Sequence, residues 1–131
     1  MLLALSYLIA TLLGITAGIL TGITPGIHIN LVSVVVVSML PFLSKYADFV
    51  SLACFILAMS VTHTFLDFIP SIFLGAPEEA TALGVLPGHR YLLKGYGLMA
   101  VKLSVLGSLG AVFLSILLFP ALVPLVTWLY P

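Results

Sequence analysis

The stretch GITAGILTGITPGIHIN (residues 14–30) decides the fold of this chain, because it joins a close-packing helix face to a break in that helix. Three glycines recur at four-residue spacing before the break: Gly14, Gly18 and Gly22. Residues four apart lie near one face of a helix, and glycine lets a second helix backbone approach that face closely. We therefore expect this face to pack against another helix.

The break that follows is made of residues that cannot simply continue a helix. Thr24 precedes a proline and so favours extended geometry, Pro25 has no backbone N–H to donate, and Gly26 tolerates the dihedral angles of a turn. His28 and Asn30 then open a second apolar run. Unpaired backbone groups are costly in hydrocarbon, so an uncharged break between apolar helices is typical of a position that lines a cavity.

The composition places the chain in a membrane. Of its 131 residues, 63% are hydrophobic and 6% are charged, whereas about 25% of an average soluble domain is charged. Successive apolar helices exceed what a soluble core of this length can bury. We expect an all-α, multi-pass integral protein of the cell membrane, with residues 1–131 as a single transmembrane domain. The net charge is zero and no basic run is present, which excludes nucleic acid as a partner.

Turn residues divide the chain into about five helical segments. Asp48 is placed to cap the third segment, and Pro70 is placed to end it. Glycine and proline crowd residues 75–88, which we interpret as a second broken or re-entrant region. A polar loop is expected at residues 88–97, and the final apolar stretch, residues 121–130, is too short to cross a bilayer alone. The predicted segments cover residues 2–22, 28–42, 49–67, 77–84 and 98–119.

The few charges predict an orientation. Arg90 and Lys94 lie in the expected polar loop, which the positive-inside rule places in the cytoplasm. Lys45 favours the same side, so the segment between the two loops would have to cross and return. In the last long helix, Gly107 and Gly110 form a second pair suited to close helix packing.

Three motifs in this order resemble the tripartite tricarboxylate transporter large membrane subunit (TctA) family, over about residues 12–113. They are a glycine-spaced helix with a Pro-Gly break (Gly18, Gly22, Pro25, Gly26), a Pro-Gly-Glu-Ala-Ser-like turn (Pro77, Glu78, Glu79, Ala80, Thr81), and two glycines before an apolar helix (Gly88, Gly95). The resemblance implies one half of a two-repeat secondary transporter, either a half-transporter or a truncated permease. It also implies carboxylate import with a second half or another copy of the chain, a small membrane subunit and an extracytoplasmic binding protein.

The first break is the candidate anion site. Helix ends that face a cavity present unpaired amides and a positive dipole end, which suit a carboxylate or a phosphate. The alternative is a tight hairpin between two packed helices. The residues assigned to substrate binding are Thr21, Thr24, Pro25, Gly26, His28 and Asn30, with Thr81 from the second broken region.

A second candidate site is ionisable. His63 and Asp67 lie four residues apart in an apolar segment, so on a helix they share a face. Intramembrane ionisable residues are costly, and coupling to H+ or Na+ is the natural role for this pair, with Glu79 as a further candidate. Alternatively, Asp67 caps backbone freed by Pro70 and His63 lies at a helix interface.

Other classes of function have less support in the sequence. His63, Asp67 and Thr64 could imitate a hydrolytic set, but there is no nucleophile elbow, metal-ligand spacing or Walker-type loop, so we expect no enzyme, cofactor or metal. A small membrane assembly protein that associates through its glycine face without moving a solute is one alternative. A transporter of another anion, such as a lipid phosphate, is the other.

Overall fold

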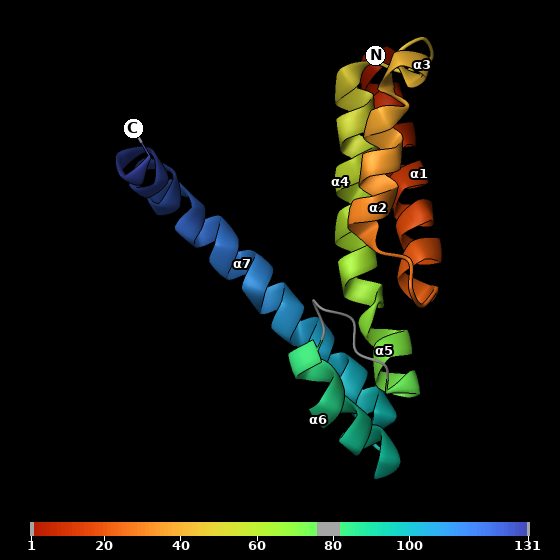
Figure 1. The fold of residues 1–131 in the computed structure, drawn as a ribbon, viewed down its shortest axis with the longest axis vertical. Coiled ribbons are helices and arrows are strands. Elements are labelled where there is room, and N and C mark those ends of the chain that lie inside the picture. Colours follow the sequence, from red (N-terminus) through yellow and green to blue (C-terminus); the bar gives the residue numbers. More distant parts are fainter. Residues whose placement is uncertain (1, 76–81, 131) are drawn as a thin grey trace.

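A computed structural model describes residues 2–75 and 82–130 of the chain, and this part is helical throughout apart from short turns. The helices are α1 (Leu2–Ile23), α2 (Ile29–Ser38), α3 (Leu40–Leu43), α4 (Phe49–Leu66), α5 (Phe68–Leu74), α6 (Ala82–Leu93) and α7 (Gly97–Leu129) (Figure 1). Three stretches are long and apolar enough to cross a membrane: Leu3–Ile23, Phe49–Leu74 and Gly97–Leu129. The prediction of an all-α fold with membrane-spanning helices is confirmed.

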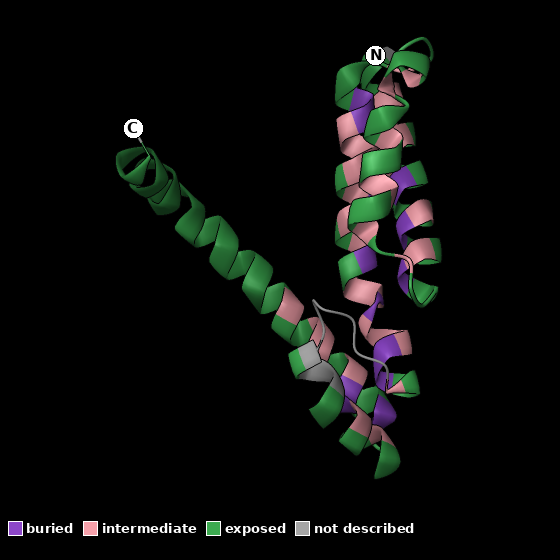
Figure 2. Cartoon of the chain, in the orientation of Figure 1, coloured by how far each residue is buried: buried purple, intermediate pink, exposed green. Residues whose placement is uncertain are grey.

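The helices form a bundle at one end of the molecule and an elbow at the other (Figure 1). α1 and α4 run side by side in the same direction, while α2 returns antiparallel to them and contacts α4. α5 continues the course of α4 to the far end, where it packs against α6 and the start of α7. α7 then leaves the elbow alone, and its residues 111–129 are all exposed (Figure 2).

The glycine face of α1 is what lets α1 and α4 pack so closely. A Cβ added at Gly18 would lie 2.6 Å from the carbonyl oxygen of Met59, and one at Gly22 would lie 3.0 Å from that of His63. All three glycines of this face are buried, Gly14 included, and Met59 beside them has no exposed surface. The centre of the bundle is therefore a backbone contact that larger residues would prevent.

α4 begins where the sequence predicts, because Asp48 caps it. Its Oδ1 accepts hydrogen bonds from the backbone N–H groups of Val50 (3.0 Å) and Ser51 (3.1 Å). The Ser51 hydroxyl donates to the other carboxylate oxygen at 2.6 Å. The two backbone bonds satisfy N–H groups that the first turn of a helix leaves unpaired, and the hydroxyl bond holds the carboxylate in place.

α4 ends at Leu66, close to the predicted end at Asp67, but the chain becomes helical again at once as α5, and Pro70 lies inside that helix. The physical reason is that a proline ring clashes with the carbonyl four residues earlier, here Leu66, so the distortion appears one turn before the proline. α5 ends at Gly75, whose φ of 66° is left-handed and typical of a helix C-terminus.

The second broken region is shorter than predicted. A helix that ends near Gly84 and a polar loop over residues 88–97 are both wrong, because α6 continues from Ala82 to Leu93 with Pro87 inside it. Packing overrides the turn signals: a Cβ at Gly88 would lie 2.9 Å from the Ile72 side chain, so this glycine serves a close contact with α5. The expected start of the short helix, at residues 77–81, lies outside the described part of the chain.

The end of the chain also differs from the prediction. Residues 98–119 and 121–130 are not two segments, because α7 runs through Pro120 and Pro124 as one helix of 33 residues. Apolar surroundings favour this outcome, since a lost hydrogen bond at each proline costs less than an unpaired turn of backbone in hydrocarbon. Gly107 and Gly110 lie on this helix, and an added Cβ at either would have no atom within 4 Å. Close helix packing through these two glycines would therefore need another polypeptide, and it stays a prediction.

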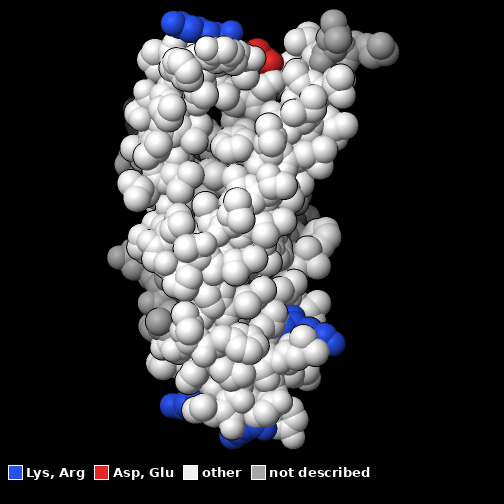
Figure 3. Space-filling model, turned by 90° about the vertical axis from the view of Figure 1, so that its right-hand side faces the viewer, with Lys and Arg blue, Asp and Glu red and all other residues white. Residues whose placement is uncertain are grey.

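The charged side chains do not share one side. Lys45 precedes α4 at the bundle end, whereas Arg90 and Lys94 lie on α6 and just after it, at the elbow end. Figure 3 shows basic side chains near both ends of the long axis and an uncharged surface between them. Among the described residues between these loops, Phe49–Leu74 passes from one end toward the other, so Lys45 does not lie on the same side as Arg90 and Lys94.

Candidate functional site

Buried polar side chains gather where α1 ends and α4 gives way to α5. His63, Asp67 and Ser71 follow one another at four-residue spacing and are 4%, 6% and 4% exposed. The end of α1 and the turn to α2 lie at about this level of the bundle (Figure 1). The two interruptions of the helices therefore occur near each other, beside a line of buried polar groups.

His63 is held by a residue of α1. Its Nδ1 lies 3.0 Å from the hydroxyl oxygen of Thr21, and the same hydroxyl donates to the carbonyl of Gly18 at 3.3 Å. This contact joins the last turn of α1 to the last turn of α4.

Asp67 connects α4 to α5 through its backbone. Its N–H donates to the carbonyl of His63 at 2.9 Å, and its own carbonyl accepts from the N–H of Ser71 at 3.3 Å. Its side chain makes no cap hydrogen bond to α5. His63 lies at the interface of α4 with α1, as the predicted alternative to coupling has it.

The α1–α2 turn presents its predicted site residues at the surface of this chain. Thr24, Pro25, Gly26, His28 and Asn30 are all exposed. The hydroxyl of Thr24 donates to the carbonyl of Leu20 at 2.7 Å, and Gly26 takes a left-handed φ of 82°. Thr21, which is half-buried, does reach the buried polar line, where it meets His63, a residue predicted for coupling. Glu79 and Thr81 lie outside the described residues.

Two polar residues at the α4–α5–α6 junction did not emerge from the sequence. Ser71 extends the line that begins at His63, and its four-residue spacing from Asp67 is a signal that could have revealed it. The Nδ1 of His89, on α6, donates to the carbonyl of Ile72 at 2.7 Å. No sequence pattern links His89 to Ile72, because the contact between them depends on how α6 folds back onto α5.

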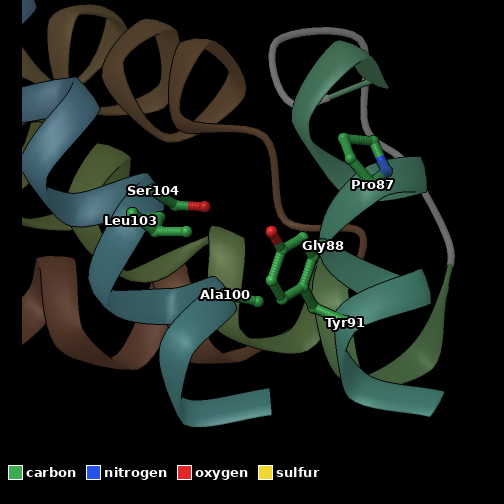
Figure 4. Close-up of a pocket in the computed structure, with 6 residues that line it drawn as sticks. All are labelled: Pro87, Gly88, Tyr91, Ala100, Leu103 and Ser104. Atoms are coloured by element: carbon green, nitrogen blue, oxygen red, sulfur yellow. The ribbon is translucent and has the colours of Figure 1, made fainter. Parts of the chain in front are cut away.

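A pocket of about 230 Å³ lies apart from this site, between α6 and α7. Figure 4 shows Tyr91 pointing from α6 toward Ala100 and Ser104 of α7. The residues that line it, Pro87, Gly88, Tyr91, Ala100, Leu103 and Ser104, are uncharged. Small-molecule sites are usually larger, at roughly 300 Å³ or more, and a carboxylate would find no cation here. This pocket is not the candidate anion site.

The composition of the described part also bears on metals. Within residues 2–75 and 82–130, no group of three histidine, cysteine or acidic side chains is arranged to hold a metal ion.

Comparison with known proteins agrees with this architecture. Residues 8–130 match the tripartite tricarboxylate transporter TctA family. The chain is 40% identical over 119 residues to the uncharacterized protein MJ1079 of Methanocaldococcus jannaschii; this match covers 89% of the chain and 28% of that relative's length. No solved structure matches. With nearly its whole length covered by one family, the chain belongs to the tripartite tricarboxylate transporter TctA family.

Proposed function

We propose that this chain is part of a multi-pass permease of the cell membrane for secondary transport of small organic anions, with carboxylates as the substrate class. The observation that carries the proposal is the contact between His63 and Thr21, inside a bundle of otherwise apolar helices. Buried polar and ionisable groups in membrane helices are costly and mark solute or proton pathways. Membership of a transporter family supports the same reading.

The anion binds at the α1–α2 break. The α1–α2 break offers hydroxyl, imidazole and amide groups at Thr21, His28 and Asn30, together with the N-terminus of α2. The positive end of a helix dipole and these donors favour a carboxylate. Broken helices that hold an anion in a membrane need surrounding protein, which the exposed turn lacks in this single chain.

Coupling arises because substrate and proton sites touch. Thr21 ends the helix that leads to the anion site, and its hydroxyl holds His63, which is one helical turn from Asp67. A change of charge on the His63–Asp67 pair alters the free energy of an anion nearby, and binding of the anion alters the proton affinity of the pair to the same extent. Either H+ or Na+ fits this scheme as the coupling ion.

Further polypeptide completes the site. The chain spans about 28% of the length of the relative that it matches, and the exposed part of α7 offers a long apolar surface. The second half of a permease, or another copy of this chain, covers the break. A small membrane subunit and an extracytoplasmic binding protein are the other expected partners, and the family name, that of a tripartite transporter, supports further subunits without specifying them.

The assembly alternative has less support. Association through the glycine face of α1 requires that face to be free, but α4 already occupies it within the chain. The other alternative, a lipid phosphate as the transported anion, can be tested in the uptake assay described below by supplying a lipid phosphate in place of the carboxylate.

The experiment is uptake by the complete transporter reconstituted in vesicles, with candidate carboxylates and an imposed proton or sodium gradient. Asp67→Asn should abolish the dependence of uptake on the gradient while it leaves anion binding largely intact. Asp48→Asn is the matched control, because this carboxylate caps α4 at the opposite end of the helix. If Asp67→Asn remains fully gradient-driven, the coupling role is wrong.

A second variant tests the anion site separately. Asn30→Leu should remove a hydrogen-bonding group worth about 1–3 kcal/mol, which weakens binding about tenfold or more. The control is Ser38→Leu, at the far end of the same helix, which is also exposed. Normal binding by Asn30→Leu would mean that the anion site is elsewhere.

A further inference from the structure

The basic residues of the chain are divided unequally between the two ends of the molecule. Lys45 lies just before α4 at the bundle end. The other three lie at the elbow end: Arg90 is in α6, Lys94 directly follows α6, and Lys102 is the sixth residue of α7. All four side chains are exposed, and Figure 3 shows basic side chains toward both ends of the long axis.

These two charged levels are separated by about the thickness of a bilayer. Asp48, at the start of α4, marks the first level. Arg90 marks the second, because the neighbouring imidazole of His89 donates to the carbonyl of Ile72 at 2.7 Å. Ile72 follows Asp48 by 24 residues along an apolar helical stretch. This corresponds to about 36 Å, whereas the hydrocarbon layer is about 30 Å thick. The two ends therefore lie on opposite sides of the membrane.

The unequal division indicates which end faces the cytoplasm. Lys and Arg residues near the ends of membrane helices favour the cytoplasmic side, and acidic residues contribute little to this preference. Glu78 and Glu79, which precede α6 in the sequence, therefore do not change the comparison. Three basic residues against one favour the elbow end as the cytoplasmic end, and they leave Lys45 on the outside.

The end of α1 lies in the half of the membrane that is nearer the elbow. Thr21 is 3.0 Å from His63, and a Cβ at Gly22 would lie 3.0 Å from the carbonyl oxygen of the same histidine, so these residues are at one level of the bundle. His63 is the fifteenth residue of the 26-residue stretch Phe49–Leu74. The turn that follows Thr21 is therefore beyond the middle of this stretch, toward the elbow.

Close packing separates this turn from the bundle end. A Cβ at Gly18 would lie 2.6 Å from the carbonyl oxygen of Met59, whose side chain has no exposed surface. α2 contacts α4 as it returns to the bundle end (Figure 1). Thr24, Pro25 and Gly26 of the turn itself are exposed. The turn is thus exposed on the elbow side of a tightly packed region.

We propose that the elbow end faces the cytoplasm, that the bundle end faces the outside, and that in this arrangement the α1–α2 turn is accessible from the cytoplasm only. The structure is then the inward-facing form of the chain. The meaning of this access for transport rests on the proposed function, because an anion held at the turn would exchange with the cytoplasm.

The test is cysteine labelling by a membrane-impermeant maleimide, with the complete transporter in right-side-out and inside-out vesicles and a Cys54→Ala background. Two exposed tyrosines provide a matched pair, since Tyr46 at the bundle end is 76% exposed and Tyr96 at the elbow end is 61% exposed. Tyr46→Cys should be labelled in right-side-out vesicles alone, and Tyr96→Cys in inside-out vesicles alone. Any other pattern would overturn the orientation.

Access to the turn is measured in the same vesicles with Thr24→Cys. We expect labelling in inside-out vesicles and its loss in right-side-out ones. Met59→Cys, which replaces a fully buried side chain in the packed region, is the control and should stay unlabelled on both sides. Labelling of Thr24→Cys from the outside, labelling from neither side, or labelling of Met59→Cys would overturn the proposed access.

The labelling pattern does not depend on transport, so its failure is distinct from that of the proposed function. Absence of carboxylate uptake with the expected labelling would refute the proposed function alone. Normal carboxylate uptake with the reversed labelling would refute the orientation alone.

Discussion

Replacing Gly18 with alanine tests the closest contact in the bundle. The added Cβ would lie 2.6 Å from the carbonyl oxygen of Met59, 2.7 Å from the Cβ of Thr62 and 3.2 Å from the backbone nitrogen of His63. Two of these three atoms belong to backbone, so they cannot move aside as the end of a flexible side chain can. α1 and α4 must separate, and overpacking of this kind costs about 1–3 kcal/mol.

Alanine also favours a helix over glycine by about 1 kcal/mol, which would offset part of this cost. Gly107→Ala supplies the control, because it makes the same change inside a helix where no atom lies within 4 Å of the new Cβ. The gain in helix propensity is common to both variants. The free energy of unfolding of Gly18→Ala should therefore be lower than that of Gly107→Ala by the packing cost alone, about 1–3 kcal/mol.

The assay is unfolding of the purified chain by titration with a denaturing detergent, followed by circular dichroism. If Gly18→Ala is as stable as Gly107→Ala, α1 and α4 do not approach as closely as the structure places them, and the reasoning is refuted. If Gly107→Ala is instead destabilised when a second copy or a partner is present, the predicted packing role of Gly107 gains its first support.

Two other changes test local contacts. Hydrogen bonds hold the pKa of the Asp48 carboxyl below its ordinary value; the largest effect comes from the Ser51 hydroxyl and smaller ones come from backbone N–H groups. The charged carboxylate therefore stabilises α4 fully at pH values above the ordinary pKa, about 3.9. This stabilisation is lost as the pH falls through the folded-state pKa. Ser51→Ala should move that loss to higher pH in a series of thermal melts, and an unchanged profile would contradict the assignment. Thr21→Val should destabilise the chain by about 1–3 kcal/mol, because it removes the hydroxyl that His63 contacts. Thr24→Val, at an exposed site, should change stability by less than about 0.5 kcal/mol in the same detergent titration, and equal effects would argue against the His63 contact.

The parts of the fold that sequence predicts well are those decided by a few neighbouring residues. Pro25 and Gly26 fix the end of α1, because one lacks a donor and the other permits a left-handed φ. Asp48 fixes the start of α4 through bonds to residues two and three positions ahead. These interactions are complete within one turn, so no knowledge of the rest of the fold is needed.

The parts that sequence predicts poorly depend on distant contacts. Gly84, Pro87 and Gly88 indicate a loop when only local preference counts, yet α6 passes through all three because its inner face packs on α5. The contact between Thr21 and His63 joins positions 42 residues apart. To predict this contact, one must know which residues of α1 lie beside which residues of α4. The glycines of α1 allow the two helices to pack closely, but they do not specify this register.

The same register explains why Thr21, predicted for substrate binding, meets His63, predicted for coupling. Pro25 interrupts the chain after α1, and Pro70 distorts the helix that runs beside α1 at Asp67. Because α1 and α4 run in the same direction, the end of α1 meets the last turn of α4, where His63 contacts Thr21. Each proline also removes a backbone donor, so both interruptions depend on nearby polar side chains or on ligand. Under the proposed function, a ligand bound at the first interruption would act through the Thr21 hydroxyl on His63, one helical turn before the second interruption. Substitution of Thr21 should therefore weaken the coupling of uptake to the gradient as well as stability, whereas substitution of Thr24 should affect neither.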